Sequence, residues 1–420
     1  MTKLKSCSVL ILLILTVLLF ASCFEGDGAQ TSIEDQTSGA LQTENVQTDE
    51  QTSFDKDETY PEQTTQDVIT VPKDPVRISL VAMGDNLIHS PIFKQASLGG
   101  GKYDFLPKYK DVSEMIGAAD IAYINQETPM CGEEYGYHNY PQFNTPQQMG
   151  HDLVSLGFDV ICFANNHILD QSSKGLEKML DFTETLDALT VGAYRNEEDA
   201  QSIRVLECKG VRIAFLAYTY DTNISPLKSS DTVVPLIERE RIERDVEKAK
   251  MCSDVIIASM HWGKENKYTT TDDQKQYAQL LADLGVDVIL GHHPHVIQPI
   301  EWIQGVNGNK TLCYYSLGNG INCQDYLKNM VGITACFDIV YQEGEQPYIE
   351  NASCIPTFCY QSTNYKNVQL FLLENLTDDM AENHHCNSKG NKVTVESARK
   401  IVTDTICAEF LPEYLKKESN

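Results

Sequence analysis

The sequence predicts an α/β fold, because short apolar runs rich in Val and Ile alternate along the chain with amphipathic segments of helical period. Many of these apolar runs end in Asp, Asn or His, and the carboxyl ends of strands are where α/β folds place functional groups. The last third of the chain changes to successive strand-like runs. The length of 420 residues allows one large domain or two ordinary ones.

The expected strands are apolar runs bounded by turn residues. They cover residues 76–83, 121–124, 158–163, 189–192, 203–207, 211–218, 254–260, 286–290, 312–316, 332–341 and 348–358. The runs 203–207 and 211–218 predict a hairpin around Lys209 and Gly210. Helices are expected where apolar residues recur every three to four positions. These segments are residues 109–119, 147–156, 174–186, 237–252, 274–284 and 393–411.

The first 23 residues are typical of a targeting segment. Lys3 and Lys5 precede an apolar run at residues 9–20, which is too short for a comfortable membrane span. The end of this segment, Ala21-Ser22-Cys23, resembles the lipobox of bacterial lipoproteins. Cys23 would then be the lipidated first residue of a protein held on the extracytoplasmic face of the cell membrane. The alternatives are a secretory signal cleaved elsewhere and an uncleaved anchor.

Residues 24–75 are rich in Gln, Thr, Ser, Asp and Glu and poor in apolar residues. Such a segment cannot bury enough surface to offset its ordering entropy, so we expect a disordered acidic tether. The formal net charge of the chain is −27, which disfavours nucleic-acid binding because phosphates would be repelled. There are 13 cysteines but no CxxC pair, so a thiolate zinc site is not expected.

The densest group of candidate metal ligands follows the expected strand at 286–290. His292, His293 and His295 come directly after Gly291, and Pro294 restricts the backbone at His293. Imidazoles at the mouth of a buried strand suit a divalent transition metal. The alternative is a polar loop that carries histidines by chance. Three histidines in four residues, in a chain with only 10, favour the metal site.

Other expected strands end in residues of the same kinds. These residues are Asp85, Asn125, Glu127, Asn165, Asn166, His167, Asp170, His261 and Asn319. Because parallel strands bring their carboxyl ends to one edge, we expect a single centre with mixed oxygen and nitrogen ligands for one or two divalent ions. Glu265, four residues after His261, could pair with that histidine. The alternative is ordinary turn chemistry, which uses Asp and Asn as well.

In their order along the chain, these motifs resemble the CapA-type poly-γ-glutamate capsule biosynthesis proteins. The resemblance runs from about residue 76 to about residue 356. Its motifs are Gly84-Asp85, Asn125-x-Glu127, Asn165-Asn166-His167-x-x-Asp170, His261-Trp262-Gly263-x-Glu265, Gly291-His292-His293-Pro294-His295-Val296-x-Gln298 and Ser316-Leu317-Gly318-Asn319. That family is similar to the calcineurin-like metallophosphoesterases.

The resemblance implies a four-layer α/β/β/α metallophosphoesterase-like sandwich with mixed sheets over residues 76–360. Residues 361–420 would form a C-terminal extension with a terminal helix. The implied cofactor is one or two divalent ions, either Mn, Zn or Fe. The implied ligands are Asp85, Glu127, Asn166, His167, His261 and one or two of His292, His293 and His295. We assign catalysis to His167, His261 and Glu265, and substrate contacts to Asn125, Asn165, Asp170, Trp262 and Asn319.

The sequence departs from the family pattern in three places. Asp85 is followed by Asn86-Leu87, so the Asp-x-His opening of the phosphoesterases is absent. Asp170-Gln171-Ser172 stands where relatives often have Asp-Tyr-Gly, and Tyr220-Asp221-Thr222-Asn223 stands where they often have Tyr-Gly-Thr-Asn. These changes are compatible with the implied ligand set, and they bear on the implied substrate contacts.

The resemblance implies a role in making, exporting or anchoring poly-γ-glutamate at the cell envelope. The expected partners are the membrane through a lipid anchor, the anionic polymer or its precursor, and other capsule synthesis or export proteins. The metal ligands favour a hydrolase. The alternatives are a non-catalytic accessory protein that binds the polymer and a secreted metal-dependent phosphodiesterase.

Overall fold

The computed structural model describes residues 74–342 and 344–416 of the chain. The expected signal segment with Cys23 lies outside the described residues, as does nearly all of the expected tether. Within the described part, no helix combines the length and the apolar composition that crossing a bilayer requires. The 11 cysteines from Cys131 to Cys407 are all free thiols there.

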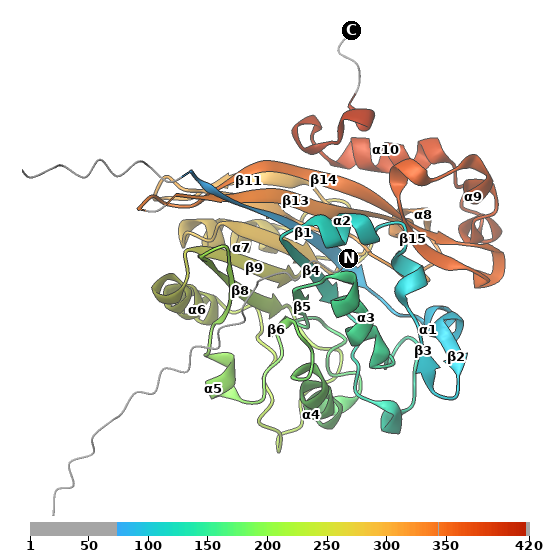
Figure 1. Ribbon diagram of the computed structural model, residues 1–420, viewed down its shortest axis with the longest axis horizontal. Helices are drawn as coiled ribbons and strands as arrows, with labels where there is room; N and C mark the ends of the chain where they lie inside the picture. Colours follow the sequence, from blue (N-terminus) through green and yellow to red (C-terminus); the bar gives the residue numbers. More distant parts are fainter. Residues whose placement is uncertain (1–73, 343, 417–420) are drawn as a thin grey trace, which may run out of the picture. The chain divides into compact units, whose positions relative to one another are not determined.

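Two β-sheets carry the fold (Figure 1). The first has seven strands in the order β15-β14-β13-β1-β4-β5-β6. Its strands are β1 (Val76–Asn86), β4 (Ile121–Gln126), β5 (Val160–Cys162), β6 (Leu189–Val191), β13 (Val331–Tyr341), β14 (Tyr348–Gln361) and β15 (Val368–Leu372). The second has six strands in the order β11-β12-β10-β9-β8-β7. They are β7 (Arg204–Cys208), β8 (Val211–Thr219), β9 (Val255–His261), β10 (Val288–His292), β11 (Ile300–Gln304) and β12 (Lys310–Tyr314).

Both sheets are mixed, as the sequence and its resemblance predict. In the first sheet β1, β4, β5 and β6 are parallel, whereas β13, β14 and β15 are antiparallel. In the second sheet β8, β9, β10 and β12 are parallel, and the edge strands β7 and β11 are antiparallel. The parallel strands of both sheets carry the functional residues at their carboxyl ends. A two-stranded ribbon of β2 (Ser97–Gly99) and β3 (Lys102–Tyr103) lies apart from both sheets.

The helices are mostly short, and 3₁₀ turns complete the connections. The α-helices are α1 (Ser90–Ala96), α2 (Ser113–Ala118), α3 (Gln148–Leu156), α4 (Ser172–Thr183), α5 (Glu197–Ala200), α6 (Arg239–Cys252), α7 (Asp272–Asp283), α8 (Leu327–Met330), α9 (Asp378–Glu382) and α10 (Val395–Thr405). The 3₁₀ turns are Leu106–Tyr109, Glu133–Tyr135, Thr363–Tyr365, Leu373–Asn375, His385–Lys389, Ala408–Phe410 and Glu413–Leu415.

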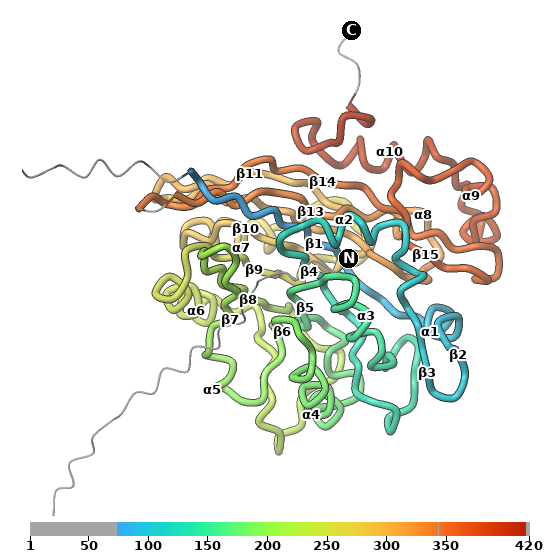
Figure 2. The backbone as a smooth tube through the Cα atoms, viewed as in Figure 1, coloured from blue at the N-terminus to red at the C-terminus, as the bar shows by residue number. Residues whose placement is uncertain are grey.

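The two sheets face each other, and helices cover their outer faces (Figures 1 and 2). Strand alternation sorts the side chains of the second sheet. In β9, Ile257 joins the core shared with the first sheet, whereas Ile256 and Met260 pack against α6 and α7. The Tyr123 hydroxyl in β4 donates to Ser259 Oγ in β9 over 2.6 Å, which joins the sheets through a polar contact. The four-layer α/β/β/α arrangement is therefore confirmed.

Three element predictions need correction. The helix expected at 109–119 is reduced to α2, because Leu106–Tyr109 forms a separate 3₁₀ turn. The helix expected at 393–411 ends at Thr405, since Ile406 is extended at φ −100° and ψ 130°. The edge strands β11 and β15 were not predicted. β15 pairs with β14, so the first sheet continues past residue 360.

Gly84 allows the two segments next to Asp85 to approach closely. A Cβ at Gly84 would lie 2.0 Å from the Gly318 carbonyl oxygen, which accepts the Asp85 backbone N–H over 2.9 Å. We expect Gly84→Ala to lower the free energy of unfolding by about 3 kcal/mol, since the neighbouring atoms are backbone and cannot move aside. Urea unfolding measures this difference.

The matched control is Gly117→Ala in α2, where the nearest atom to the added Cβ is the Leu156 carbonyl oxygen at 3.9 Å. There alanine should be neutral or stabilising, because it favours the helix over glycine. Equal unfolding free energies for the two variants would contradict the close approach at Gly84.

Candidate metal centre

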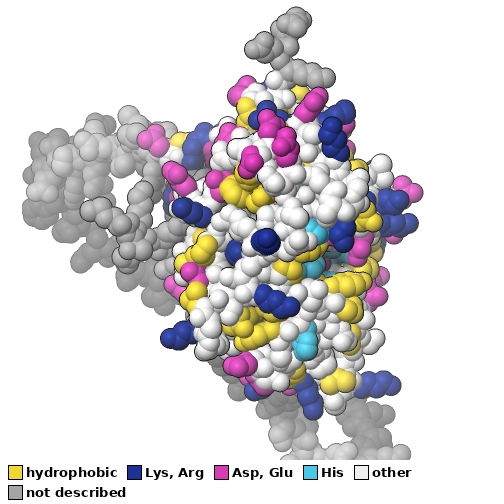
Figure 3. All heavy atoms as spheres, turned by 90° about the vertical axis from the view of Figure 1, so that its right-hand side faces the viewer, with side chains coloured by type: hydrophobic (Ala, Val, Ile, Leu, Met, Phe, Trp, Pro, Cys, Tyr) yellow, Lys and Arg dark blue, Asp and Glu magenta, His cyan; other side chains and the backbone are white. Residues whose placement is uncertain are grey.

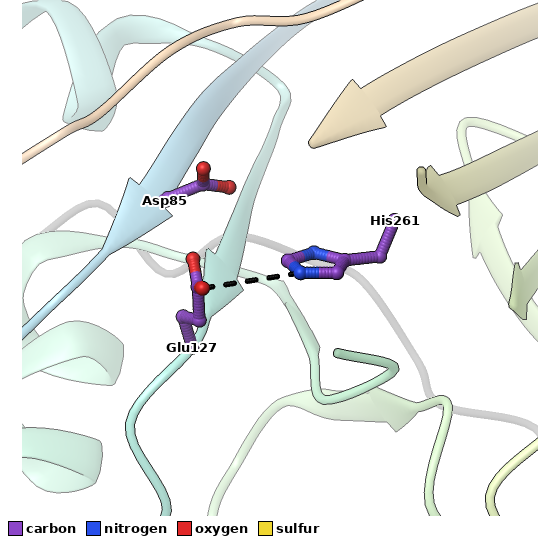
Figure 4. Close-up of side chains that lie close together, drawn as sticks. All are labelled: Asp85, Glu127 and His261. Atoms are coloured by element: carbon purple, nitrogen blue, oxygen red, sulfur yellow. Dashed lines mark ion pairs between the residues drawn. The ribbon is translucent and has the colours of Figure 1, made fainter. Parts of the chain in front are cut away.

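Strand ends from both sheets meet at one edge of the sandwich. Asp85 lies at the end of β1, Glu127 directly follows β4, and His261 ends β9. In Figure 4 these three side chains point toward one another from separate strands. Each offers a ligand atom within 4.8 Å of the others, and all three side chains are fully buried. Residues far apart in the sequence thus form a group of the kind that binds metal ions.

The histidine segment after β10 closes the other side of this group. His295 Nδ1 lies 3.0 Å from Asp85 Oδ2, and His295 Nε2 lies 3.7 Å from Glu127 Oε1. The His293 backbone N–H donates to Asp85 Oδ2 over 3.2 Å, and its ring centroid lies 4.9 Å from that of His261. Both histidines have positive φ, 97° at His293 and 56° at His295. Such backbone conformations are costly outside glycine and cluster at functional sites.

His292 contacts Asp85 and Tyr123 and so differs from His293 and His295. Its Nε2 lies 3.2 Å from the Tyr123 hydroxyl, and its Nδ1 lies 3.3 Å from Asp85 Oδ1. Asn125 Nδ2 donates to the same Asp85 oxygen over 2.9 Å. His292 and Asn125 therefore orient the Asp85 carboxylate, and Tyr123 in turn holds His292.

The segment after β5 brings a histidine–carboxylate pair to the same edge. Asn166 Oδ1 lies 2.9 Å from His261 Nε2, which connects this segment to the central group. His167 Nδ1 lies 2.8 Å from Asp170 Oδ2, and both residues are buried. Asn165 accepts the His167 backbone N–H and donates to the Gln126 carbonyl oxygen, so it fixes the shape of the segment.

The buried charges shift one another's pKa values in opposite directions. Burial would raise the pKa of Asp85, but the hydrogen bonds of His292 and His295 hold it well below its usual value. Burial and the charge of Asp85 raise the pKa of Glu127 well above its usual value. For His295 burial lowers the pKa, yet Glu127 and Asp85 outweigh it and raise the value to about 9. Burial and the charge of His295 lower the pKa of His293 to about 3.

Several buried polar atoms at this edge have no hydrogen-bond partner. They include both carboxylate oxygens of Glu127, His261 Nδ1, His293 Nδ1 and Asn125 Oδ1. A buried carboxylate without donors costs several kcal/mol unless a cation compensates it. The mixed oxygen and imidazole donors match Mn, Zn or Fe better than Ca, which takes oxygen ligands only. The residues therefore fit a divalent transition metal.

Two of the expected site residues are not brought to the centre. Trp262 lies on the opposite face of the second sheet from His261, because successive side chains of a strand alternate. Its indole N–H donates to the Tyr315 carbonyl oxygen over 2.9 Å, and it packs toward α7. Glu265 is exposed, and within the described residues it makes no hydrogen bond to His261, whose Nε2 faces Asn166 instead. The charge of Glu265 still raises the pKa of His295.

Asn319 is buried at the edge but supports the backbone. Its Nδ2 donates to the carbonyl oxygens of His295 and Asn329 over 3.4 and 3.0 Å. The neighbouring Gly318 offers its carbonyl oxygen to the Asp85 N–H. These residues hold the histidine segment and Asp85 in place.

Sequence reasoning missed three residues that position the site. Tyr123 bridges Ser259 and His292, and its only signal is a hydroxyl within an apolar strand. Asn223 Nδ2 lies 3.2 Å from His167 Nδ1, and its Oδ1 accepts from Asn166. Asn329 donates to the His295 carbonyl oxygen and gives no local signal in the sequence.

Two capsule biosynthesis proteins from Bacillus species are similar to this chain. The chain is 30% identical over 229 residues to the PGA biosynthesis protein CapA of Bacillus subtilis (strain 168), which covers 52% of this chain and 58% of that protein. It is 25% identical over 262 residues to the capsule biosynthesis protein CapA of Bacillus anthracis, covering 60% of this chain and 61% of that protein. The chain thus spans about three fifths of the length of these relatives.

Among solved structures, the NAD nucleotidase (NadN) of Haemophilus influenzae aligns with a TM-score of 0.42 and 12% identity, over 79% of this chain and 60% of that chain. The family model described as bacterial capsule synthesis protein PGA_cap matches residues 79–324, which is more than half of the chain and includes every strand that carries a candidate ligand. The chain therefore belongs to the bacterial capsule synthesis protein PGA_cap family.

Proposed function

We propose that this protein is a lipid-anchored, extracytoplasmic metal-dependent hydrolase that acts on poly-γ-glutamate or its precursor during synthesis, export or anchoring. The names of the two CapA relatives support the polymer, and the residues of the buried centre support the chemistry. The observation that carries the proposal is Glu127, a fully buried carboxylate whose oxygens accept no hydrogen bond and which lies between the imidazoles of His261 and His295. Such a group either takes up a proton or is compensated by a cation, and a bound cation would keep it ionised.

Asp85, Glu127 and His261 would hold the ion, with His293, His295 and Asn166 as further ligands. Glu127 Oε1 lies 3.8 Å from His261 Nε2 and 3.7 Å from His295 Nε2, so either one ion or two could share its carboxylate. When bound, a divalent ion supplies a Lewis acid that stabilises charge developing on a phosphoryl or acyl oxygen. The residues that would hold the ion are nearly all buried, so the surrounding protein fixes their side chains and excludes water from the site.

His167 is the residue that we assign to proton transfer. Its Nδ1 lies 2.8 Å from Asp170 Oδ2, so the Asp170 carboxylate accepts the Nδ1 proton and leaves Nε2 for exchange with a leaving group. Asp170 also accepts the Phe143 backbone N–H over 2.7 Å, which fixes the carboxylate. Asp170 is therefore a positioning residue, and we keep Asn165, Asn125 and Asn319 as parts of the supporting framework.

The purified protein should contain divalent metal at one or two ions per chain by elemental analysis. It should hydrolyse a generic phosphodiester or poly-γ-glutamate with Mn or Zn, and chelation should remove both metal and turnover. Re-addition of metal should restore turnover, which distinguishes metal loss from unfolding. A protein that binds metal and polymer but turns over neither substrate would contradict the hydrolase and support an accessory, polymer-binding role.

A further inference from the structure

Two segments are hydrogen-bonded to the histidine segment at the centre: the loop after β9 and the short helix α8. The Asn266 backbone N–H donates to the Pro294 carbonyl oxygen over 2.7 Å. Asn329 Nδ2 donates both to the His295 carbonyl oxygen over 3.0 Å and to Asn266 Oδ1 over 2.9 Å. The loop after β9 and the short helix α8 before β13 therefore contact the segment that carries His293 and His295.

A lysine lies next to each of these asparagines. Lys267 follows Asn266 and is exposed, and Lys328 precedes Asn329 in α8. Lys328 Nζ donates to the Asn266 carbonyl oxygen over 3.3 Å and lies 5.5 Å from the ring centroid of Tyr326, so its contacts are a carbonyl and an aromatic ring. Lys267 directly follows Asn266, whose carbonyl oxygen Lys328 Nζ contacts, so the two lysines lie on adjoining parts of the surface. Burial and then the charge of Lys267 lower the pKa of Lys328.

Two neighbouring ammonium groups repel each other and do not stabilise the fold. Lys264 in the same turn adds a third positive charge. The carboxylates next to these lysines are Glu265, which is exposed, and Asp325, which pairs with Lys389 and accepts from Tyr365. In Figure 3 lysine and arginine side chains are spread over the face shown, and a few histidine side chains lie among them. On a chain with a net charge of −27, this positive group at the metal centre is the feature that an anion would recognise.

We propose that Lys267 and Lys328 form a binding site for two carboxylates of an acidic polymer, beside the metal centre. The inference rests on the proposed function, because it places the polymer's scissile bond at that centre. Lysine ammonium groups are compact point charges with three donors, so each can pair with one anionic group of the polymer. The names of the two CapA relatives favour a polycarboxylate over a polyphosphate. The Asn266 backbone N–H and the Asn329 side chain bind carbonyl oxygens of the histidine segment, so they fix the lysines relative to His293 and His295. A polymer bound to the lysines would therefore lie at a fixed distance from the metal centre.

The test compares polymer affinity between two variants of the purified full chain. Lys267→Gln with Lys328→Gln removes the proposed site. Lys250→Gln with Lys310→Gln removes the same net charge from exposed lysines at the other end of the second sheet. Binding of fluorescently labelled poly-γ-glutamate is measured at low and at physiological salt, with polyphosphate of matched charge as competitor. Metal content by elemental analysis shows that each variant is folded.

The site variant should bind poly-γ-glutamate about tenfold more weakly at low salt, and its affinity should depend less on salt, since two screened attractions are lost. The control variant should bind like the wild type. Equal losses in both variants, or unchanged affinity in the site variant, would overturn the proposal. Polyphosphate binding as tightly as poly-γ-glutamate would overturn the choice of a polycarboxylate. Binding is measured without turnover. A protein that binds the polymer through these lysines but hydrolyses no substrate would therefore contradict the proposed hydrolase activity and still support the binding site.

Discussion

Replacing Glu127 with glutamine is expected to abolish stable metal binding while making the metal-free protein more stable. Glu127 is fully buried, and neither of its oxygens has a hydrogen-bond partner. Glutamine keeps the shape but carries no charge, so the variant loses the central ligand and also the cost of burying a carboxylate. We expect affinity for Mn or Zn to fall at least 100-fold, and the free energy of unfolding of the metal-free protein to rise by about 2 kcal/mol at neutral pH.

The stability difference between wild type and Glu127→Gln should depend on pH. Burial and Asp85 raise the pKa of Glu127 in the folded protein, so the folded state keeps a proton that the unfolded chain releases near pH 4.3. The metal-free wild type should therefore lose stability as the pH rises above about 4.5, up to the raised pKa. Asp85 has the opposite effect on stability. Its pKa is lowered in the folded protein, so its carboxylate stabilises the fold above the pKa of the unfolded chain, and this stabilisation is lost as the pH falls below that pKa. The stability difference between wild type and variant should thus grow from about pH 4.5 upward.

Urea unfolding of chelated samples from pH 4 to 8, together with metal titration, measures both parts. Glu301→Gln on the edge strand β11 is the control, because Glu301 is exposed and should change neither quantity. A Glu127→Gln variant that binds metal like the wild type would show that Glu127 is no ligand. A variant that is less stable than the wild type without metal would show that its carboxylate has a partner after all.

The edge at which the site forms could be predicted from the sequence, because parallel strands place their carboxyl ends together. Asp85, Glu127, His261 and His295 are each recognisable as polar residues after an apolar run. Their convergence follows from topology alone and needs no knowledge of side-chain contacts. The short apolar runs also sufficed to find most strands of both sheets, including the edge strands β6 and β7, whereas the edge strands β11 and β15 were missed.

Side-chain direction was harder to predict, because it depends on register. In β1 the pairing with β4 skips Gly84, so that Met83 pairs with Ile124 and Asp85 with Asn125. This bulge changes the alternation and turns Asp85 toward the centre, as bulges beside active sites often do. No such irregularity interrupts β9, so Trp262 follows the ordinary alternation away from His261. A sequence motif contains both residues side by side and cannot separate them.

The supporting residues could not be predicted, because their partners lie far away in the sequence. Asn329 reaches the His295 carbonyl oxygen across 34 positions, and Tyr123 reaches His292 across 169. Each is an ordinary residue in its own segment. Their roles exist only after the two sheets have packed, and this packing depends on the whole core rather than on any local pattern.

Replacing His167 with alanine is expected to lower turnover by about 100- to 1,000-fold while metal content stays at the wild-type value. The reason is that His167 Nδ1 donates to Asp170, outside the group formed by Asp85, Glu127 and His261. Loss of a proton donor lowers turnover by about this factor, whereas loss of a metal ligand would also lower the metal content of the protein. Metal analysis alongside steady-state kinetics on a phosphodiester separates the two.

Asp170→Asn distinguishes the donor from the residue that orients it. The amide keeps the size of Asp170 but removes the negative charge beside His167, so turnover should fall about tenfold and the pH profile should shift. His151→Ala, at an exposed histidine in α3, should leave turnover unchanged. If His167→Ala instead loses metal as Glu127→Gln does, His167 is a ligand, as the family resemblance implies, and proton transfer belongs to another group. Because the pair is buried and its bond spans only 2.8 Å, an unchanged pH profile in Asp170→Asn would mean that this contact serves the fold alone.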